Sequence, residues 1–414
     1  MAIALVLLIA ELVWFILHRP VAVNDSGAQR VLAVARAAAS AQQALDVAEP
    51  ASAASAAGSV HGADEFEVCG GRWFKFNPEP TSAEREAFQR GIGLPEARAS
   101  LMSALRADPS DYAHAVALQL AFADDTSQTA TRDALIQLAT TTRDPRVYAL
   151  AFATCGNGSP LAADSACKML NAAQWARLDP GNAAPWMAAL VDAVARHDLA
   201  AQNEALYQIA HSERSEQRFL AVTGEVLAHM RSDDEADLPA TLALAVDAAG
   251  VDAARQFPNY QNLTQTCRGA ELTDANRRQT CAQIAELMFE RSDTLLERLI
   301  GGAIGGRVGW PQERIEAARG QYSAYTQSIL AKSASAAAGS CAAMRQDLHV
   351  FEERARLGEV GAVRQWIASS GKKDEDFVRL ERDEQLRRVA DAASAASAAA
   401  LLPLPLGEGR GEGR

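Results

Sequence analysis

Six cysteines form the set of residues whose spacing carries a chemical prediction in this sequence. Cys155 and Cys167 bracket one turn-rich stretch of the chain, and Cys267 and Cys281 bracket another. In each pair we expect the first cysteine to end one helix and the second to open the next. Two antiparallel helix ends then come within the Cα separation of about 5.5 Å that suits a disulfide. No C-x-x-C motif occurs to indicate zinc or thioredoxin-type chemistry. The spacing therefore predicts two local disulfide bonds.

A third bond is predicted between Cys69 and Cys341. Cys69 lies in a segment, residues 65–81, that concentrates Phe and Trp residues in a short extended stretch. We expect this segment to be a strap docked on a helical body and tied through Cys69 to Cys341, because such aromatic side chains favour burial. A contact surface for a ligand or partner is the alternative. Each local bond would stabilise the fold by about 3 kcal/mol, which requires an oxidising compartment. Alternatively, all six cysteines are reduced and simply buried.

The N-terminus predicts a membrane anchor. Residues 2–17 are apolar except for Glu11, and the apolar stretch extends through residues 20–23. About twenty such residues cross a bilayer, so we expect a single transmembrane helix in a bacterial inner membrane. A cleaved signal peptide and a buried helix are the alternatives. Arginines that follow the segment favour a cytoplasmic body, whereas the paired cysteines favour the periplasm, and we give the cysteines more weight.

Composition limits the class of partner. The chain has 414 residues, enough for two average domains or one extended array. Its wealth of Ala and Arg is typical of a high-GC bacterial genome. The formal net charge of −12 argues against nucleic-acid binding, which needs a basic surface to neutralise phosphates. We therefore expect a protein or peptide partner.

The chain from residue 82 onward shows helical spacing, interrupted by Asp-Pro pairs at residues 108, 144 and 179, which are 36 and 35 residues apart. A period near 35 is typical of stacked helix pairs. We expect each proline to end one helix, after which Asp111 or Asn182 caps the next.

One of these repeats resembles a tetratricopeptide repeat. It begins with Leu178-Asp179-Pro180-Gly181-Asn182 and Trp186, and a turn at His197-Asp198 leads into a second helix. The match departs from the family where glycine is expected at His197 and where the small residue Ala201 is one place out of register. The resemblance implies an all-α, irregular helix-pair repeat array whose groove face carries four apolar residues, Ala184, Met187, Val191 and Val194. An apolar ligand or internal packing would suit that face.

These signals divide the chain into six segments. They are an anchor or signal-like segment (1–20), a helix and Ala/Ser/Gly-rich linker (21–64), the aromatic strap (65–81), helix-pair repeats (82–250), an irregular helical region (251–372), and a charged helix with a tail (373–414).

The motifs of common catalytic sites are missing from the sequence. The seven histidines do not lie at metal-ligand spacings, and no G-x-S-x-G elbow occurs. Five glycines in residues 299–310 fit neither dinucleotide-binding nor P-loop spacing, so close helix contact or a helix break is favoured. We therefore expect no metal and no cofactor.

Three functions are compatible with these observations. The leading hypothesis is a membrane-anchored periplasmic interaction scaffold. The second is a cell-envelope enzyme with an active site in residues 255–370, which a cleft with convergent polar groups and a perturbed carboxylate would support. The third is a structural cytoplasmic protein with reduced cysteines.

Overall fold

The structure is a computed structural model that describes residues 65–75, 77, 80–124, 128–156, 166–230, 234–254, 260–334, 339–383 and 386–387. The expected anchor, the linker and the tail lie outside the described residues. Among the residues described, no helix is both long enough and apolar enough to cross a bilayer.

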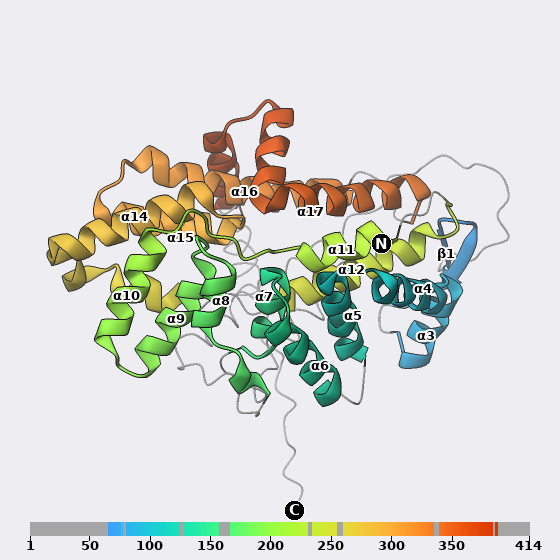
Figure 1. Ribbon diagram of the computed structural model, residues 1–414. Helices are drawn as coiled ribbons and strands as arrows, with labels where there is room; N and C mark the ends of the chain where they lie inside the picture. Colours follow the sequence, from blue (N-terminus) through green and yellow to red (C-terminus); the bar gives the residue numbers. More distant parts are fainter. Residues whose placement is uncertain are drawn as a thin grey trace, which may run out of the picture.

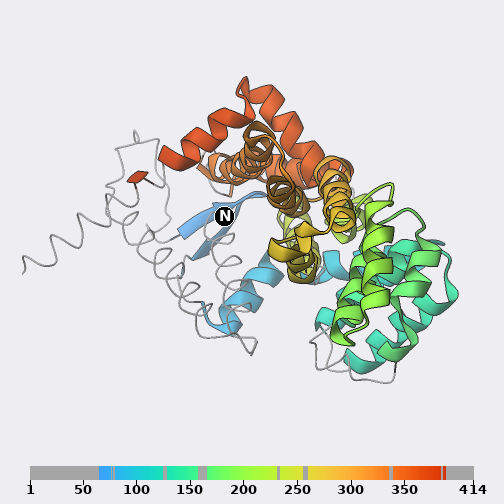
Figure 2. The same cartoon turned by 90° about the vertical axis from the view of Figure 1, so that its left-hand side faces the viewer.

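In the part of the chain that the structure describes, the fold is all-α apart from one two-stranded hairpin, as shown in Figures 1 and 2. The hairpin pairs β1 (Glu65–Val68) with β2 (Arg72–Lys75) in antiparallel register. The α-helices that follow are α3 (Ser82–Gly91), α4 (Leu94–Ala107), α5 (Asp111–Asp124), α6 (Gln128–Thr141), α7 (Pro145–Thr154), α8 (Ala172–Leu178), α9 (Ala184–Ala195), α10 (Leu199–Ala210), α11 (Ala221–His229), α12 (Leu238–Ala254), α13 (Tyr260–Thr266), α14 (Ala275–Arg291), α15 (Leu295–Val308), α16 (Gln312–Ala334) and α17 (Cys341–Ser370). Two short 3-10 helices are η2 (Cys167–Met169) and η3 (Gly269–Thr273).

Consecutive helices pack against each other along most of the chain, which gives a helical-repeat-like arrangement. The pairs α5 with α6, α9 with α10, α11 with α12 and α14 with α15 are in extensive contact. The long α17 returns from the end of the chain and runs across α11 and α12 (Figure 1). It is kinked at Gly358, whose φ is 69°.

The Asp-Pro pairs differ in what they do. The one at 108 follows the end of α4, and Ser110, rather than Asp111, caps α5 by accepting from the backbone N–H of Tyr112 at 3.2 Å. The pair at 144 begins a helix: Asp144 is the N-cap of α7, and Pro145 occupies its first turn. Our expectation that this proline ends a helix was wrong, because proline lacks the N–H that a first turn leaves unpaired anyway.

The helix pair α9 and α10 forms where the sequence predicts it. Asn182 accepts from the backbone N–H of Ala184 at 3.2 Å and so supports the start of α9. Asp198 caps α10 by accepting from the N–H of Ala201 at 3.0 Å. Between the helices His197 has a φ of 54°, a left-handed conformation that favours glycine.

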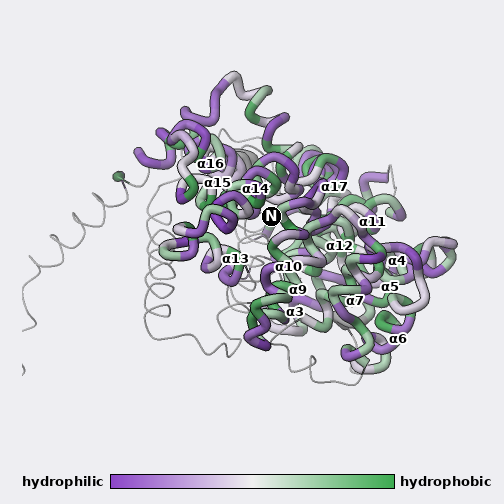
Figure 3. Tube along the Cα trace, turned by 60° about the vertical axis from the view of Figure 1, so that its left-hand side comes forward, coloured by the Kyte–Doolittle hydropathy of each residue, from purple (hydrophilic) through white to green (hydrophobic). Residues whose placement is uncertain are grey.

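Three apolar cores hold the helices together. The largest lies between helices α4, α5, α6, α7, α11 and α12 and the start of α17. The second lies between α9, α10, α13, α14 and α15. The third lies under α16 and α17. Along most helices hydrophobic and hydrophilic residues alternate, as one-sided burial requires (Figure 3). The second core crosses the expected division at residue 250, which itself falls inside α12.

The glycine-rich stretch is helical and lets α15 approach its neighbours closely. A Cβ atom on Gly301 would lie 2.8 Å from the backbone nitrogen of Phe289 in α14, and one on Gly302 would lie 3.1 Å from the Cβ of Ala318 in α16. The prediction of close helix contact is confirmed.

Candidate functional site

A cleft of about 660 Å³ opens between the hairpin, the α3–α4 pair and the α11–α12 pair. We call it the hairpin cleft. Its apolar lining comes from buried or half-buried residues, Ile92, Ala97, Leu101, Met230, Ala236 and Ala240. Its polar lining carries both charges and two hydroxyls, from Arg72, Arg90, Glu96, Ser100, His229, Asp237 and Thr241. The lining is therefore mixed: polar groups make up its larger part, around an apolar floor.

The turn between α3 and α4 shapes one wall of the cleft. Ile92 ends α3 and is buried, and Gly93 follows with a φ of 75°, so the chain reverses there without steric cost. At its other end α3 is fixed by a capping box, in which Thr81 and Glu84 satisfy each other's backbone N–H groups. The wall is therefore defined by local sequence.

The hairpin that forms the second wall is fastened by a disulfide. Cys69 and Cys341 are bonded with a Cα separation of 4.7 Å, across 272 residues of sequence. The backbone N–H of Cys69 donates to the carbonyl of Gly339 at 2.8 Å. The Cys69 sulfur also lies 3.3 Å from the carbonyl oxygen of Glu235, in the turn that precedes α12. One cysteine thus ties the hairpin to two elements that are distant in sequence.

The aromatic residues of the hairpin pack inward against α3. The rings of Phe74 and Phe88 meet edge to face with centroids 4.7 Å apart, and the Phe66 ring lies 6.1 Å from that of Phe74. Beside them Arg72 donates to the carbonyl of Gly91 at 2.7 Å. The aromatic residues therefore hold the hairpin on the helical body, whereas Arg72 faces the cleft.

His229, at the end of α11, lines the cleft with both ring nitrogens engaged. Its Nδ1 lies 2.9 Å from the carbonyl oxygen of Glu225 and its Nε2 lies 3.1 Å from Oδ2 of Asp108. Because both partners accept, the two bonds form together only when the ring carries two protons. Burial opposes that charge, but the hydrogen bonds to Glu225 and Asp108 outweigh it and raise the pKa of His229. The ring therefore acts as a cationic link between α4 and α11.

Arg146 adds a second cation behind this link. Burial raises the pKa of the Glu225 carboxyl, and the positive charges of His229 and Arg146 oppose that rise. Arg146 pairs with Asp144 at 2.6 Å.

With both His229 nitrogens occupied, neither is free to act as a general base, so nucleophilic chemistry has no support at the cleft.

A second polar cluster lies in the region where an enzyme site was the alternative. Burial raises the pKa of Glu297 to about 8, and the charge of Asp293 adds to the rise. Burial also raises the pKa of Asp293 to about 6. These are perturbed carboxyls, yet Glu297 has no exposed surface and the hairpin cleft lies elsewhere. As folded, the Glu297 carboxyl is out of reach of a substrate.

Neither cluster has a set of side chains that could bind a metal ion. Within the described part of the chain, no group of three or more His, Cys, Asp or Glu side chains could hold a metal ion.

No model of a known protein family, no curated protein and no solved structure matches this chain.

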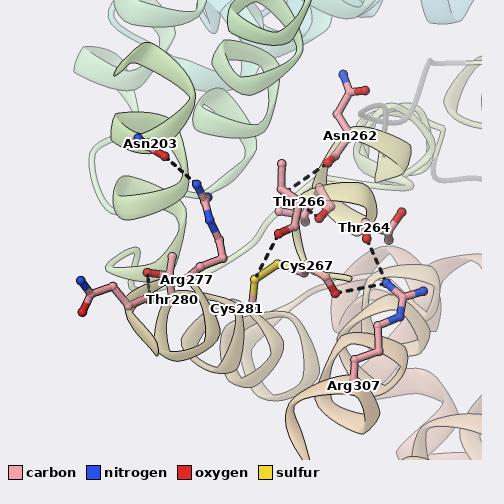
Figure 4. The surroundings of a disulfide bond; sticks show 11 residues. Asn203, Asn262, Thr264, Thr266, Cys267, Arg277, Thr280, Cys281 and Arg307 are labelled. Carbon is pink, nitrogen blue, oxygen red and sulfur yellow. Dashed lines mark hydrogen bonds between the residues drawn. A yellow bond between two sulfur atoms is a disulfide. The ribbon is translucent and has the colours of Figure 1, made fainter. Parts of the chain in front are cut away.

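Four of the six cysteines pair as their spacing predicts, although Cys281 lies inside α14 and does not open it. Cys155 with Cys167 and Cys267 with Cys281 each have a Cα separation of 5.6 Å. Figure 4 shows that Arg307 caps the carbonyl oxygens beside the second bond, donating to Thr264 at 3.0 Å.

The four residues expected on a groove face of α9 differ in how deeply they are buried. Ala184 and Met187 are buried in two different cores, and Val191 and Val194 are half-buried on α9. The hairpin cleft includes none of the four. Their placement matches the internal-packing alternative for Ala184 and Met187.

Sequence reasoning did not find the hairpin cleft. Its lining runs from residue 72 to residue 241, so no local motif marks it. Arg72 and His229 look like ordinary surface residues until the disulfide brings their elements together. The one usable signal was the pairing of Cys69 with Cys341, which places the aromatic segment on the helical body.

Proposed function

We propose that this protein is a membrane-anchored periplasmic scaffold of the tetratricopeptide-like type, which holds a peptide or protein partner in the hairpin cleft. The observation that carries the proposal is a binding-type cleft whose hairpin wall is fastened by a disulfide bond. The disulfide stabilises that wall only where thiols are oxidised.

The periplasmic assignment rests on the cysteines. Every cysteine in the described residues is in a disulfide bond, and none is free. Disulfides of this kind persist in the bacterial periplasm and are rare in the cytosol. The apolar residues 2–17 would hold such a protein at the inner membrane.

The lining of the cleft favours a peptide. Buried Ile92, Leu101 and Ala240 offer an apolar floor to side chains. Around that floor the lining carries the guanidinium groups of Arg72 and Arg90 and the carboxylates of Glu96 and Asp237. Such a rim complements both the carbonyl and the N–H groups of an extended chain, while the apolar floor binds alternate side chains.

Two substitutions on α4 test the proposal. Ser100 is exposed and lines the cleft, whereas Ala99 is exposed one residue earlier and does not. We expect Ser100→Trp to fill the cleft and to remove partners that crosslink to the wild-type chain in native membranes. Ala99→Trp, the matched control, should keep them. Identical crosslinks from both variants would overturn the proposal.

Compartment is tested separately. A reporter that is active only outside the cytoplasm, fused after residue 414, should be active. An inactive fusion beside an active cytoplasmic reporter at the same position would contradict a periplasmic body.

A further inference from the structure

The segment that connects α10 to α11, residues 211–220, docks on the start of α15 through polar contacts. The Ser215 backbone N–H donates to the Arg291 carbonyl at 3.0 Å, and the Asp293 N–H donates to the Ser215 carbonyl at 3.2 Å. The Asp293 carboxylate accepts from the backbone N–H groups of Gln217 at 2.9 Å and Arg218 at 2.7 Å. We call residues 211–220 the connecting segment.

Glu297 lies beneath this segment and has an uneven set of partners. Its Oε1 accepts from the Gln217 side-chain amide at 2.7 Å and from the Tyr260 hydroxyl at 2.9 Å. Its Oε2 is buried and has no hydrogen-bond partner. The Ser215 hydroxyl is also buried and lies next to the Glu297 carboxyl, where it lowers the pKa of Glu297 against the effect of burial. The Ser215 hydroxyl can accept from a protonated Oε2 or donate to an ionised one.

The charges around Glu297 are mostly of its own sign. Asp293 precedes it by one turn, Glu359 faces the site from α17, and Glu216 lies on the connecting segment. From α13 and α16 come the hydroxyls of Tyr260 and Tyr325, both kept neutral by burial, which raises their pKa values.

The nearby cations are engaged elsewhere. Arg218 pairs with buried Asp179 at 3.0 Å, and Arg354 lies over the Tyr325 ring at 4.9 Å. Ionisation of Glu297 would therefore add a negative charge to a buried region that already holds carboxylates, with no cation paired to it.

We propose that the Glu297 carboxyl is a proton-operated lock, which holds the connecting segment against α15 while it is protonated and releases the segment when it ionises. The burial of Glu297 and the carboxylates that surround it carry this inference.

Separation of the connecting segment from α15 is the response that we expect. The segment is also held on residues 179–183, where Arg214 pairs with Asp179 and the Glu216 backbone N–H donates to Asn182 at 3.0 Å. It can therefore part from α15 and stay attached there, whereas α15 is fixed by glycine contacts with α14 and α16. Detaching the segment would admit water to Glu297. It would also break the hydrogen bonds between the Asp293 carboxylate and the backbone N–H groups of Gln217 and Arg218. The pKa of Glu297, which burial raises to about 8, places the change between mildly acidic and alkaline pH.

Hydrogen exchange on the full chain tests the lock. After correction for intrinsic exchange, the amides of Gln217 and Arg218 in the wild type should lose protection at least about tenfold between about pH 6 and pH 9. Glu297→Gln keeps the shape of the protonated acid, so both amides should stay protected at both values. The control Glu290→Gln changes an exposed carboxylate that pairs with Arg314 and should behave as wild type.

Equal loss of protection in Glu297→Gln and wild type would overturn the proposal. Should that variant fail to fold, the wild type decides alone: constant protection of the connecting segment across this pH range would overturn it. Neither outcome depends on whether the hairpin cleft binds a partner.

Discussion

The disulfide between Cys69 and Cys341 joins the hairpin to the first residue of α17 and closes a loop that covers most of the described chain. The bond between Cys155 and Cys167, by contrast, spans only 12 residues. The two bonds therefore differ in what their removal should do, both to stability and to the cleft.

Replacing Cys69 and Cys341 together by serine should lower the free energy of unfolding by about 5 kcal/mol, against about 3 kcal/mol for the same change at Cys155 and Cys167, because loop-closure entropy grows with loop length. Chemical unfolding of both double variants measures this. Only the first should also lose crosslinks made through the cleft. Equal losses of stability, or a cleft that survives removal of the long-range bond, would contradict this reading.

The close packing of α15 against α14 leads to a second prediction, on the stability of glycine variants. Gly301→Ala should destabilise the fold by about 1–3 kcal/mol, because its Cβ would meet the backbone of α14. Gly250→Ala in α12 is the matched control: nothing lies within 4 Å of the new methyl group, so it should stabilise by about 0.4–1 kcal/mol. Thermal unfolding of both variants would show opposite signs; a neutral Gly301→Ala would mean that α15 packs less tightly.

The turn between α9 and α10 is strained at a position where the repeat pattern has glycine. His197→Gly should raise the free energy of unfolding by roughly 0.5–1 kcal/mol, since glycine adopts a φ of 54° without a Cβ clash. Arg196→Gly, one residue earlier at a φ of −89°, should lower it by a similar amount. A loss of stability in His197→Gly would show that the histidine side chain matters more than its backbone.

Stability should fall as pH rises from about 4.5 to about 8. The folded pKa of Glu297 is raised to about 8 from a usual 4.5, so the folded state binds the extra proton and its contribution is lost as pH rises through the folded pKa. At roughly 1.4 kcal/mol per pKa unit this amounts to several kcal/mol. His229, whose pKa is also raised, acts in the same direction. Unfolding across this range should show a shallower slope for Glu297→Gln; an unchanged slope would assign the effect to other groups.

Local features of this fold were predictable from sequence, and long-range ones were not. The pairing of α9 with α10 and the two short disulfides follow from neighbouring residues. The Asp-Pro at 144 shows the limit: aspartate followed by proline fits both the end of a helix and the start of the next, and only packing decides.

The buried polar cluster around Glu297 could not be predicted from the sequence for a related reason. Glu297 and Glu290 look alike in sequence, yet one has no exposed surface and the other pairs with Arg314 at the surface. Burial of Glu297 results from the connecting segment, which is about 80 residues away in the chain. No spacing rule reveals such a contact.

The oxidised state of the cysteines is tested by thiol alkylation of the protein taken from cells without reductant, followed by mass spectrometry of its peptides. We predict that no cysteine reacts until reductant is added, and that the linked peptides join Cys69 to Cys341, Cys155 to Cys167, and Cys267 to Cys281. Six thiols that react before reduction would contradict the oxidised, periplasmic scaffold.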